Sequence, residues 1–299
     1  MIRQINYQIK SKSSGQTVGA FLKSKGYSRS VVITLKTTKG GLTKNGEWTG
    51  VNEILQEGDC LVIKLVEKEC EQTIEAVSAI LEVLYEDEDL LVLNKPYNTP
   101  IHPSVNHYGD TLANQVMGYA KNKGESYPFR CINRLDRDTT GVTIIAKNQL
   151  SASLLGEAMS TRGLSRRYVA LVEGHIDAVG VVNKPIGRAP NSIIKRQIDN
   201  VAGKQAITHY RREQVLDVEG EVVSLVGLRL ETGRTHQIRV HMASIGHPLL
   251  GDFLYNETNT MLTRQALHGI SCAFQHPITK EMMTITAPMP DDMRKLICT

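Results

Sequence analysis

The densest group of polar side chains in this sequence lies at residues 133–141, which read NRLDRDTTG. Apolar stretches precede and follow it, and Thr139-Thr140-Gly141 predicts a turn between two strands. Catalytic groups often lie on loops that rigid elements hold. Asp136 stands between Arg134 and Arg137, so we expect a depressed pKa and an ionised carboxylate, which suits a nucleophile or a base. From these residues alone, however, a structural ion-pair loop is the favoured interpretation.

A second polar group reads ETGRTHQIRVH at residues 231–241. Gly233 breaks a strand, Arg234 follows at the junction with a helix, and Arg239 and His241 lie on that helix. A helix N-terminus beside an arginine can bind an anion. In isolation, a strand–turn–helix with charged surface residues explains the pattern slightly better.

Four histidines near the C-terminal half raise the question of a metal site: His236, His241, His247 and His268. The sequence has no HExxH motif, and a spacing of five residues puts His236 and His241 on different helix faces. We therefore expect no metal.

Tyr168 lies in a predicted strand within SRRYVALVEG, residues 165–174. A strand tyrosine usually serves packing. Its basic neighbours Arg162, Arg166 and Arg167 are candidates for phosphate contacts.

Charge gives only a weak indication of the partner. The 299 residues hold 35 Lys and Arg against 31 Asp and Glu, a net charge of +4. Basic residues gather at 161–168, while acidic residues gather at 67–75 and 82–89. One basic side could guide a phosphate backbone, and ordinary solvated faces explain the charges equally well.

The composition is that of a soluble globular protein, with 41% hydrophobic and 22% charged residues. No apolar run is long enough to cross a bilayer, and the first residues lack the features of a secretory signal. The five cysteines have no zinc-ligand spacing and fit free thiols. We expect a cytoplasmic monomer that does not bind membranes.

We expect two regions. Residues 1–75 are expected to form a small module with helices near 18–22 and 30–33, a hairpin at Asn45-Gly46 and a strand at 60–66. The charged stretch 67–75 at its end is expected to be a linker.

The second region is expected to span residues 80–299. Its strands are expected at 90–94, 141–147, 168–172 and 222–230, and its helices after Asp110 (as the cap), after Asn148 and around 238–245. The order is not a strict strand–helix alternation, which predicts an α+β fold with a mixed, mainly antiparallel sheet.

Three segments together closely resemble the RluA-like (RluA/RluD) family of RNA pseudouridine synthases. The family patterns run approximately HRLDRDTSG, K-x-Y-x-A-x-V-x-G and GRTHQIRVH followed by GHPxxGD. Here NRLDRDTTG, RRYVALVEG and GRTHQIRVHMASIGHPLLGD occur in the same order, and residues 85–104 resemble the strand and loop that lead to the family's active site. The similarity covers roughly residues 80–290.

The resemblance implies a central sheet with flanking helices and a reaction on RNA that needs no cofactor. It implies that Asp136 is the catalytic aspartate, Tyr168 the active-site tyrosine, Arg234 the basic partner of the aspartate, and Arg134 the residue that helps to displace the flipped base. Ribosomal RNA is favoured over transfer RNA as the substrate.

Two departures accompany the resemblance. The N-terminal module resembles the alpha-L RNA-binding fold, but Thr17-Val18-Gly19 replaces its usual start, and Asn133 replaces a histidine. For Asn133 we expect tuning of the activity and not its loss. The alternative functions are a non-catalytic RNA-binding or ribosome-assembly factor of the same fold, which the presence of Asp136, Tyr168 and Arg234 disfavours, and a metal-dependent hydrolase.

Overall fold

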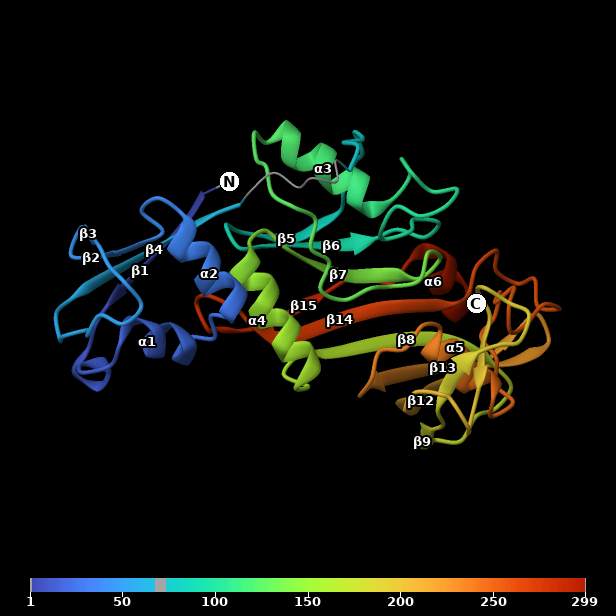
Figure 1. Cartoon of the computed structure of the whole chain (residues 1–299). Helices are drawn as coiled ribbons and strands as arrows, with labels where there is room; N and C mark the ends of the chain where they lie inside the picture. The colour runs from blue at the N-terminus through green and yellow to red at the C-terminus, as the bar shows by residue number, and fades with distance from the viewer. Residues whose placement is uncertain (1, 68–73, 299) are drawn as a thin grey trace.

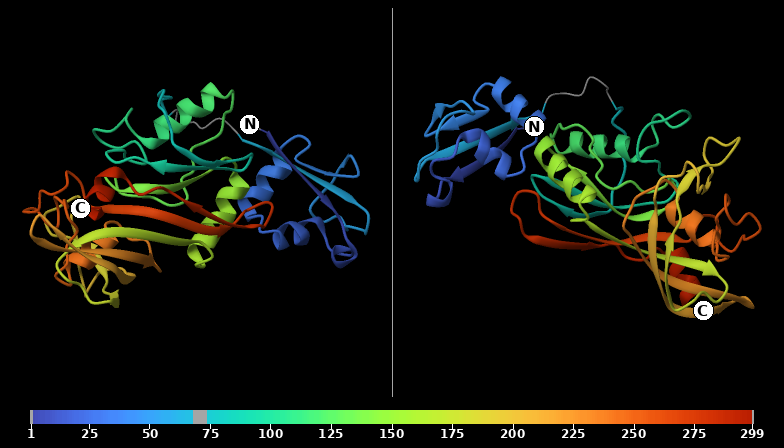
Figure 2. Two further views of the ribbon diagram at one scale, coloured as in Figure 1. Left: turned by 180° about the vertical axis from the view of Figure 1, so that it is seen from behind. Right: turned by 60° about the horizontal axis from the view of Figure 1, so that its bottom comes forward.

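The computed structural model describes residues 2–67 and 74–298. These residues form a four-stranded sheet near the N-terminus, a nine-stranded sheet in the remainder and a small two-stranded hairpin (Figure 1). Helices are few and lie beside both of the larger sheets, so the predicted α+β class with a mainly antiparallel sheet is confirmed. Figure 2 shows the N-terminal region at one end of an elongated molecule.

The N-terminal sheet has the order β1-β4-β2-β3. Its strands are β1 (Ile2–Gln8), β2 (Leu42–Lys44), β3 (Glu47–Trp48) and β4 (Cys60–Val66). Asn45 and Gly46 join β2 to β3 with φ of 56° and 89°, the left-handed conformations that a tight hairpin turn requires. The predicted hairpin and the predicted strand at 60–66 are therefore confirmed.

Three helical segments cover this small sheet: η1 (Ser11–Ser13), α1 (Val18–Ser24) and α2 (Arg29–Thr37). Thr17 and Ser28 cap α1 and α2, because their hydroxyl oxygens accept hydrogen bonds from the backbone N–H groups of Ala20 and Val31. The second helix is longer than the sequence pattern predicted.

The large sheet has the order β5-β6-β7-β14-β8-β13-β12-β9, with β15 paired to β14. Its strands are β5 (Val83–Glu86), β6 (Leu90–Lys95), β7 (Thr140–Ala146), β8 (Ser165–Glu173), β9 (Val179–Asn183), β12 (Ile207–Val218), β13 (Glu221–Leu230), β14 (Leu267–Gln275) and β15 (Met282–Thr286). Within the described residues β7 and β14 form the one parallel pair. Loops that follow or precede these central strands can therefore meet at one end of the sheet.

Alternate residues of β6 serve two cores. Leu91 and Leu93 pack with α3 (Leu112–Asn122), whereas Leu90 and Val92 pack on the other face, with α4 (Gln149–Ser160). The two helices therefore cover opposite faces of the β6–β7 half of the sheet, as Figure 1 shows.

The cap of α3 differs from the prediction. Thr111 is the N-cap and forms a capping box with Asn114, while Asp110 pairs with the ring of His107 at 2.6 Å. Thr111 has extended backbone angles directly before the first helical residue, which is the geometry a capping oxygen needs.

The other half of the chain contains elements that periodicity did not predict. The longest is β12, whose register against β13 shifts between Arg212 and Gln214, which breaks the alternation expected of a strand. The hairpin β10 (Ile186–Arg188) and β11 (Arg196–Ile198) and the C-terminal helix α6 (Asp291–Ile297) complete this half, together with α5 (Gln237–Ala243), which lies where a helix was predicted around 238–245.

The N-terminal sheet is packed against the rest of the protein. Leu150 of α4 is fully buried in the N-terminal core, and Leu154 and Ile278 pack against it. Arg3 binds both carboxylate oxygens of Asp89 at 3.0 and 2.9 Å. Figure 1 shows α2 beside α4 at this junction.

The predicted linker at 67–75 falls mostly on residues outside the described part of the chain. Glu67, its first residue, is firmly held: its carboxylate accepts from Arg130 at 2.6 Å and from the backbone N–H of Gln149 at 2.7 Å. This end of the segment is therefore part of the junction.

His268 of β14 joins the two parallel strands. Its Nδ1 faces the hydroxyl of Thr140 at 2.8 Å, and its Nε2 faces the carbonyl of Ala287 at 3.4 Å. A carbonyl can only accept, so Nε2 carries a proton. Burial lowers the pKa of His268 from 6.5 to about 4.

The stability of the fold should therefore depend on pH between about 4 and 6.5. In this window the unfolded chain binds a proton at His268 that the folded chain does not, so the free energy of unfolding should fall as the pH falls, by up to about 3 kcal/mol. Denaturant unfolding of the wild type and His268→Gln at pH 7, 5.5 and 4.5 tests this. The variant should lose less stability on acidification, and equal slopes would contradict the assignment.

Candidate active site

One cavity of about 460 Å³ opens where the centre of the large sheet meets α5. Three segments supply most of its wall: the loop before β7, the start of β8 and the turn between β13 and α5. The four residues singled out in the sequence line it, namely Arg134, Asp136, Tyr168 and Arg234. Motifs separated by up to a hundred residues therefore meet in one place of the size that a nucleotide base requires.

The loop that carries Asp136 is anchored at its start by Asn133. The buried amide of Asn133 donates to the carbonyl of Val142 at 2.7 Å and accepts from the N–H of Ile144 at 2.8 Å. Asparagine thus fixes the loop to β7 with one donor and one acceptor, and it makes no contact with Asp136 among the described residues.

Lys95 anchors the other side of this loop. Its ammonium group is fully buried at the end of β6 and donates to the carbonyls of Pro96, Thr99 and Arg137 at 2.7, 3.0 and 2.8 Å. Burial lowers the pKa of Lys95 to about 7, against the opposing effect of nearby carboxylates, of which Asp138 is the larger and Asp136 the smaller. The strand predicted at 90–94 ends just before Lys95, and nothing in the sequence indicated that Lys95 anchors this loop.

Asp136 is 24% exposed and faces the cavity. Its Oδ2 lies 3.4 Å from Nη1 of Arg239, which is buried on the inner face of α5. No hydrogen bond reaches Oδ1 from any described residue, so this oxygen is available to a bound molecule. The carboxylate is held by one charged donor and still has a free oxygen.

The expected pair between Arg234 and Asp136 is corrected by the structure, because Arg239 takes that position. Arg234 lies in the exposed turn before the helix and donates from Nε to the carbonyl of Gln205 at 3.1 Å. The arginines that flank Asp136 in sequence do not pair with it either, since Arg137 binds Asp138 at 2.9 Å. Position on the buried helix face, not closeness in sequence, selects the partner.

Tyr168 is 5% exposed and forms part of the cavity wall. Its ring edge lies against Gly269 of β14, where an added Cβ would be 3.5 Å from Cε1. Burial raises the pKa of Tyr168 to about 12, and Arg166 opposes the shift. The phenol is therefore protonated at neutral pH and offers a flat apolar face beside a hydrogen-bond donor.

Two further arginines face the cavity. Arg134 is exposed at its rim, whereas Arg166 is 8% exposed, donates weakly to the carbonyl of Thr232 at 3.4 Å and leaves its Nε without a partner. Together with Arg234 they make this side of the cavity basic, which favours a polyanionic substrate.

The four histidines considered as metal ligands have separate protein partners. His236 contacts the hydroxyl of Tyr255 at 3.0 Å, His241 bonds Thr208 at 2.9 Å, and His247 bonds the carbonyl of Glu173 at 2.7 Å. His268 links β14 to β7, as described above. They do not converge on one point, so the hydrolase alternative gains no support.

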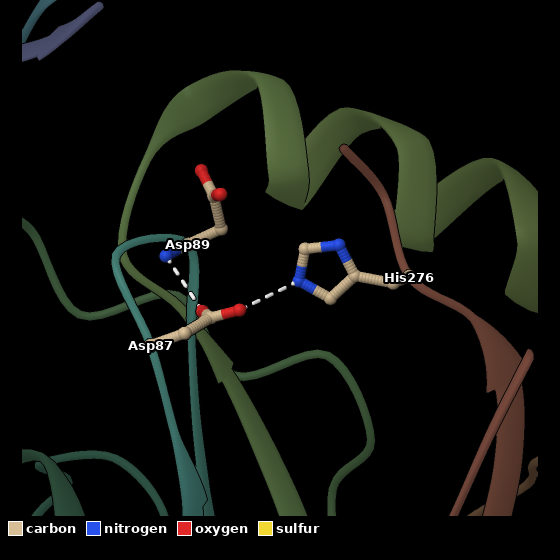
Figure 3. Close-up of side chains that lie close together, drawn as sticks. All are labelled: Asp87, Asp89 and His276. Atoms are coloured by element: carbon tan, nitrogen blue, oxygen red, sulfur yellow. Dashed lines mark hydrogen bonds and ion pairs between the residues drawn. The ribbon is translucent and has the colours of Figure 1, made fainter. Parts of the chain in front are cut away.

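Another polar cluster, formed by Asp87, Asp89 and His276, has ligand atoms close enough for a cation (Figure 3). These atoms already have donors within the protein. Asp87 accepts from the His276 ring at 2.9 Å, from Tyr85 at 2.8 Å and from two backbone N–H groups, and Asp89 binds Arg3. We interpret the cluster as a structural clamp that joins the β5–β6 turn to β14.

Comparison with known proteins agrees with the geometry. Residues 89–244 match the family described as RNA pseudouridylate synthase. An uncharacterized RNA pseudouridine synthase of Bacillus subtilis (strain 168), YjbO, is 41% identical over 283 residues, covering 94% of this chain and 98% of that protein. The ribosomal large subunit pseudouridine synthase D of Vibrio cholerae is 38% identical over 271 residues, covering 85% and 82%.

Among solved structures, human RNA pseudouridylate synthase domain containing 1 is similar, with a TM-score of 0.58 and 26% identity over 73% of this chain and 85% of that chain. The chain therefore belongs to the RNA pseudouridine synthases, in the RluA/RluD-like group that the motifs indicated. It is an isomerase that acts on RNA. The structure contains no helix that is long and apolar enough to span a membrane, among the described residues.

Replacing Lys95 by methionine should test the anchoring of the Asp136 loop. Three buried carbonyls lose their donor, so the free energy of unfolding should fall by about 2–4 kcal/mol, and the single-turnover rate at saturating RNA should fall at least about tenfold. Lys147→Met is a matched control, because Lys147 is equally buried but pairs with Glu86 and Glu125 away from the cavity. It should lose stability and keep the rate. Equal rates for all three proteins would show that Lys95 does not position the loop.

Proposed function

We propose that this enzyme converts uridines of structured RNA, with ribosomal RNA as the first candidate, to pseudouridine, and that Asp136 is its catalytic group. The observation that carries the proposal is the Asp136 carboxylate, which faces the cavity with Oδ1 free while Arg239 holds Oδ2. The name of the Vibrio cholerae relative supports the choice of ribosomal RNA. We further propose that the enzyme works as a cytoplasmic monomer without metal or cofactor.

The reaction needs few chemical groups because it is an isomerisation. The bond between C1′ and N1 of uracil breaks, the base turns, and C5 forms a new bond to C1′. C5 then loses a proton and N1 gains one, so neither electrons nor atoms are exchanged with another reactant. Cleavage develops positive charge on the ribose, and a carboxylate stabilises such a centre.

Asp136 can act on the ribose in two ways, by attack on C1′ or by removal of the 2′-proton. Both need an ionised carboxylate whose free oxygen is aimed at the sugar. Arg239 supplies a positive charge beside the carboxylate and fixes its direction by the contact with Oδ2. We therefore assign to Arg239 the pairing role that the sequence motif suggested for Arg234.

Tyr168 lies in the same wall and is suited to stack on the uracil ring. Its raised pKa means that it binds the base as a neutral phenol. If it accepts the C5 proton, it does so as a rare but strongly basic phenolate. Arg166, whose charge lowers the pKa of Tyr168, makes that form more accessible.

The target uridine must leave its stack to enter the cavity, which costs a few kcal/mol. Arg134 lies exposed at the cavity rim, and we propose that it occupies the space that the flipped base vacates. Arg234, next to the cavity in the turn before α5, is placed to contact a neighbouring phosphate.

We also propose that residues 1–75 extend the RNA-binding surface. Lys10, Lys12, Lys23, Lys25 and Arg29 are all exposed on this region. Leu150 of α4 belongs to the core of this region, so deletion of residues 1–75 would expose apolar surface on the rest of the protein. Substitution of surface residues is therefore the cleaner test.

Asp136→Asn should abolish pseudouridine formation. Asparagine has nearly the same shape but can neither trap the ribosyl centre nor accept its proton, so the single-turnover rate should fall at least about 1000-fold, a barrier change of about 4 kcal/mol. The rate is measured on total RNA from cells that lack the gene, and mapping of the products identifies the uridines. RNA affinity and thermal stability should stay near wild type. A residual rate within about tenfold of wild type would contradict the role of Asp136.

Alanine in place of Lys10, Lys12, Lys23 and Arg29 together should weaken RNA binding without slowing the chemical step. Lys25 is left in place because it lies over the rings of Tyr7 and Phe21. Each phosphate contact removed should lower the salt dependence of the affinity by roughly 0.7–0.9 in logarithmic slope. Lys121→Ala on α3 serves as a control. An unchanged salt slope would mean that this region is not an RNA-binding arm.

A further inference from the structure

Arg239 uses most of its donors on a residue other than Asp136. Its Nε and Nη2 donate to Oδ2 and Oδ1 of Asp252, both at 2.7 Å, which is a two-bond pair of the kind that fixes a guanidinium plane. Asp252 is fully buried. By comparison, the contact of Nη1 with Asp136 is long, at 3.4 Å.

The carboxylate of Asp252 is itself held in place. Its Oδ1 also accepts from the backbone N–H groups of Leu254 and Tyr255, at 3.0 and 3.2 Å. The ring centroids of Phe253 and Tyr255 lie 5.6 and 5.2 Å from the guanidinium carbon of Arg239. Residues 252–255 therefore fix the position of the Arg239 guanidinium group from several sides.

We infer that Asp252 is a positioning residue for the reaction, which fixes Arg239 so that only Nη1 reaches Asp136. This inference rests on the proposed role of Asp136. The planar, forked guanidinium group of arginine can donate two parallel hydrogen bonds to the two oxygens of one carboxylate. Without Asp252, Arg239 would be free to bind both oxygens of Asp136. Both oxygens of the catalytic carboxylate would then be occupied.

The arrangement divides one positive charge between two carboxylates. Asp252 takes the two-bond side of the fork, and Asp136 keeps a single long contact that leaves Oδ1 for the ribose. A change at Asp252 should therefore alter the rate of the chemical step, although Asp252 is fully buried and does not line the cavity.

Asp252→Asn tests the inference. Asparagine replaces one acceptor oxygen with an N–H donor, so the two-bond pair with Arg239 is lost. The single-turnover rate at saturating RNA should fall by about 100-fold, while RNA affinity stays within about threefold of wild type. The substrate is total RNA from cells that lack the gene. Asp87→Asn is the matched control, since Asp87 is a carboxylate with four protein donors whose partners do not line the cavity, and it should keep the wild-type rate.

A second variant keeps the inference testable if Asp252→Asn does not fold at the assay temperature. Arg239→Lys retains the charge but lacks the fork, so it should lose about as much rate as Asp252→Asn, and the double variant should be no slower than Arg239→Lys alone. Wild-type rates for a folded Asp252→Asn or for Arg239→Lys would overturn the inference. Equal losses in rate and affinity, matched by Asp87→Asn, would also overturn it, because they would indicate a general loss of structure.

The proposed function is judged separately by Asp136→Asn in the same assay. If Asp136→Asn keeps its activity, the proposed role of Asp136 fails whatever Asp252 does. If Asp136→Asn is inactive and Asp252→Asn is fully active, only the inference about Asp252 fails.

Discussion

Arg239 is a cation removed almost completely from water, and the arrangement of the cavity follows from the need to neutralise it. Its side chain is 3% exposed, and two carboxylates from distant parts of the chain approach it. An unpaired charge at this depth would be very costly, so α5 can dock only where Asp252 and the Asp136 loop meet it. The ion pairs that hold the docked helix thus also hold the Asp136 carboxylate, to which we assign the chemical step.

The same requirement explains what the sequence could and could not predict about the site. The order and the residue types of the three motifs identified the family correctly, and Asp136 and Tyr168 lie in the wall of one cavity. They did not distinguish Arg234 from Arg239, because both lie in one motif and only the packing of α5 decides which side chain turns inward. Lys95 and Asp252 both lie in segments that resemble the family, but their roles depend on which carbonyls and which guanidinium group the fold brings to them.

The fold was predictable to a similar extent. Local signals such as Asn45-Gly46 and the apolar run at 60–66 were sufficient, because the turn and the strand depend on neighbouring residues. The strand β12 was missed because its centre is rich in charged residues and carries a bulge. The junction between the N-terminal sheet and α4 was also missed, since nothing in the residues around Leu150 indicates which core they enter. As a result, a region that looked separable proves to share a core with its neighbour.

We propose that the position of the Asp136 carboxylate, and not only its charge, determines the rate of the reaction. Asp136→Glu is the most direct test, because glutamate keeps the charge and moves the carboxylate by one methylene. Arg239 and its partner Asp252 are left unchanged. The measurement is the single-turnover rate of pseudouridine formation at saturating RNA. We predict that the rate falls at least about 100-fold with RNA affinity unchanged, and a rate within about threefold of wild type would contradict this role of the carboxylate position.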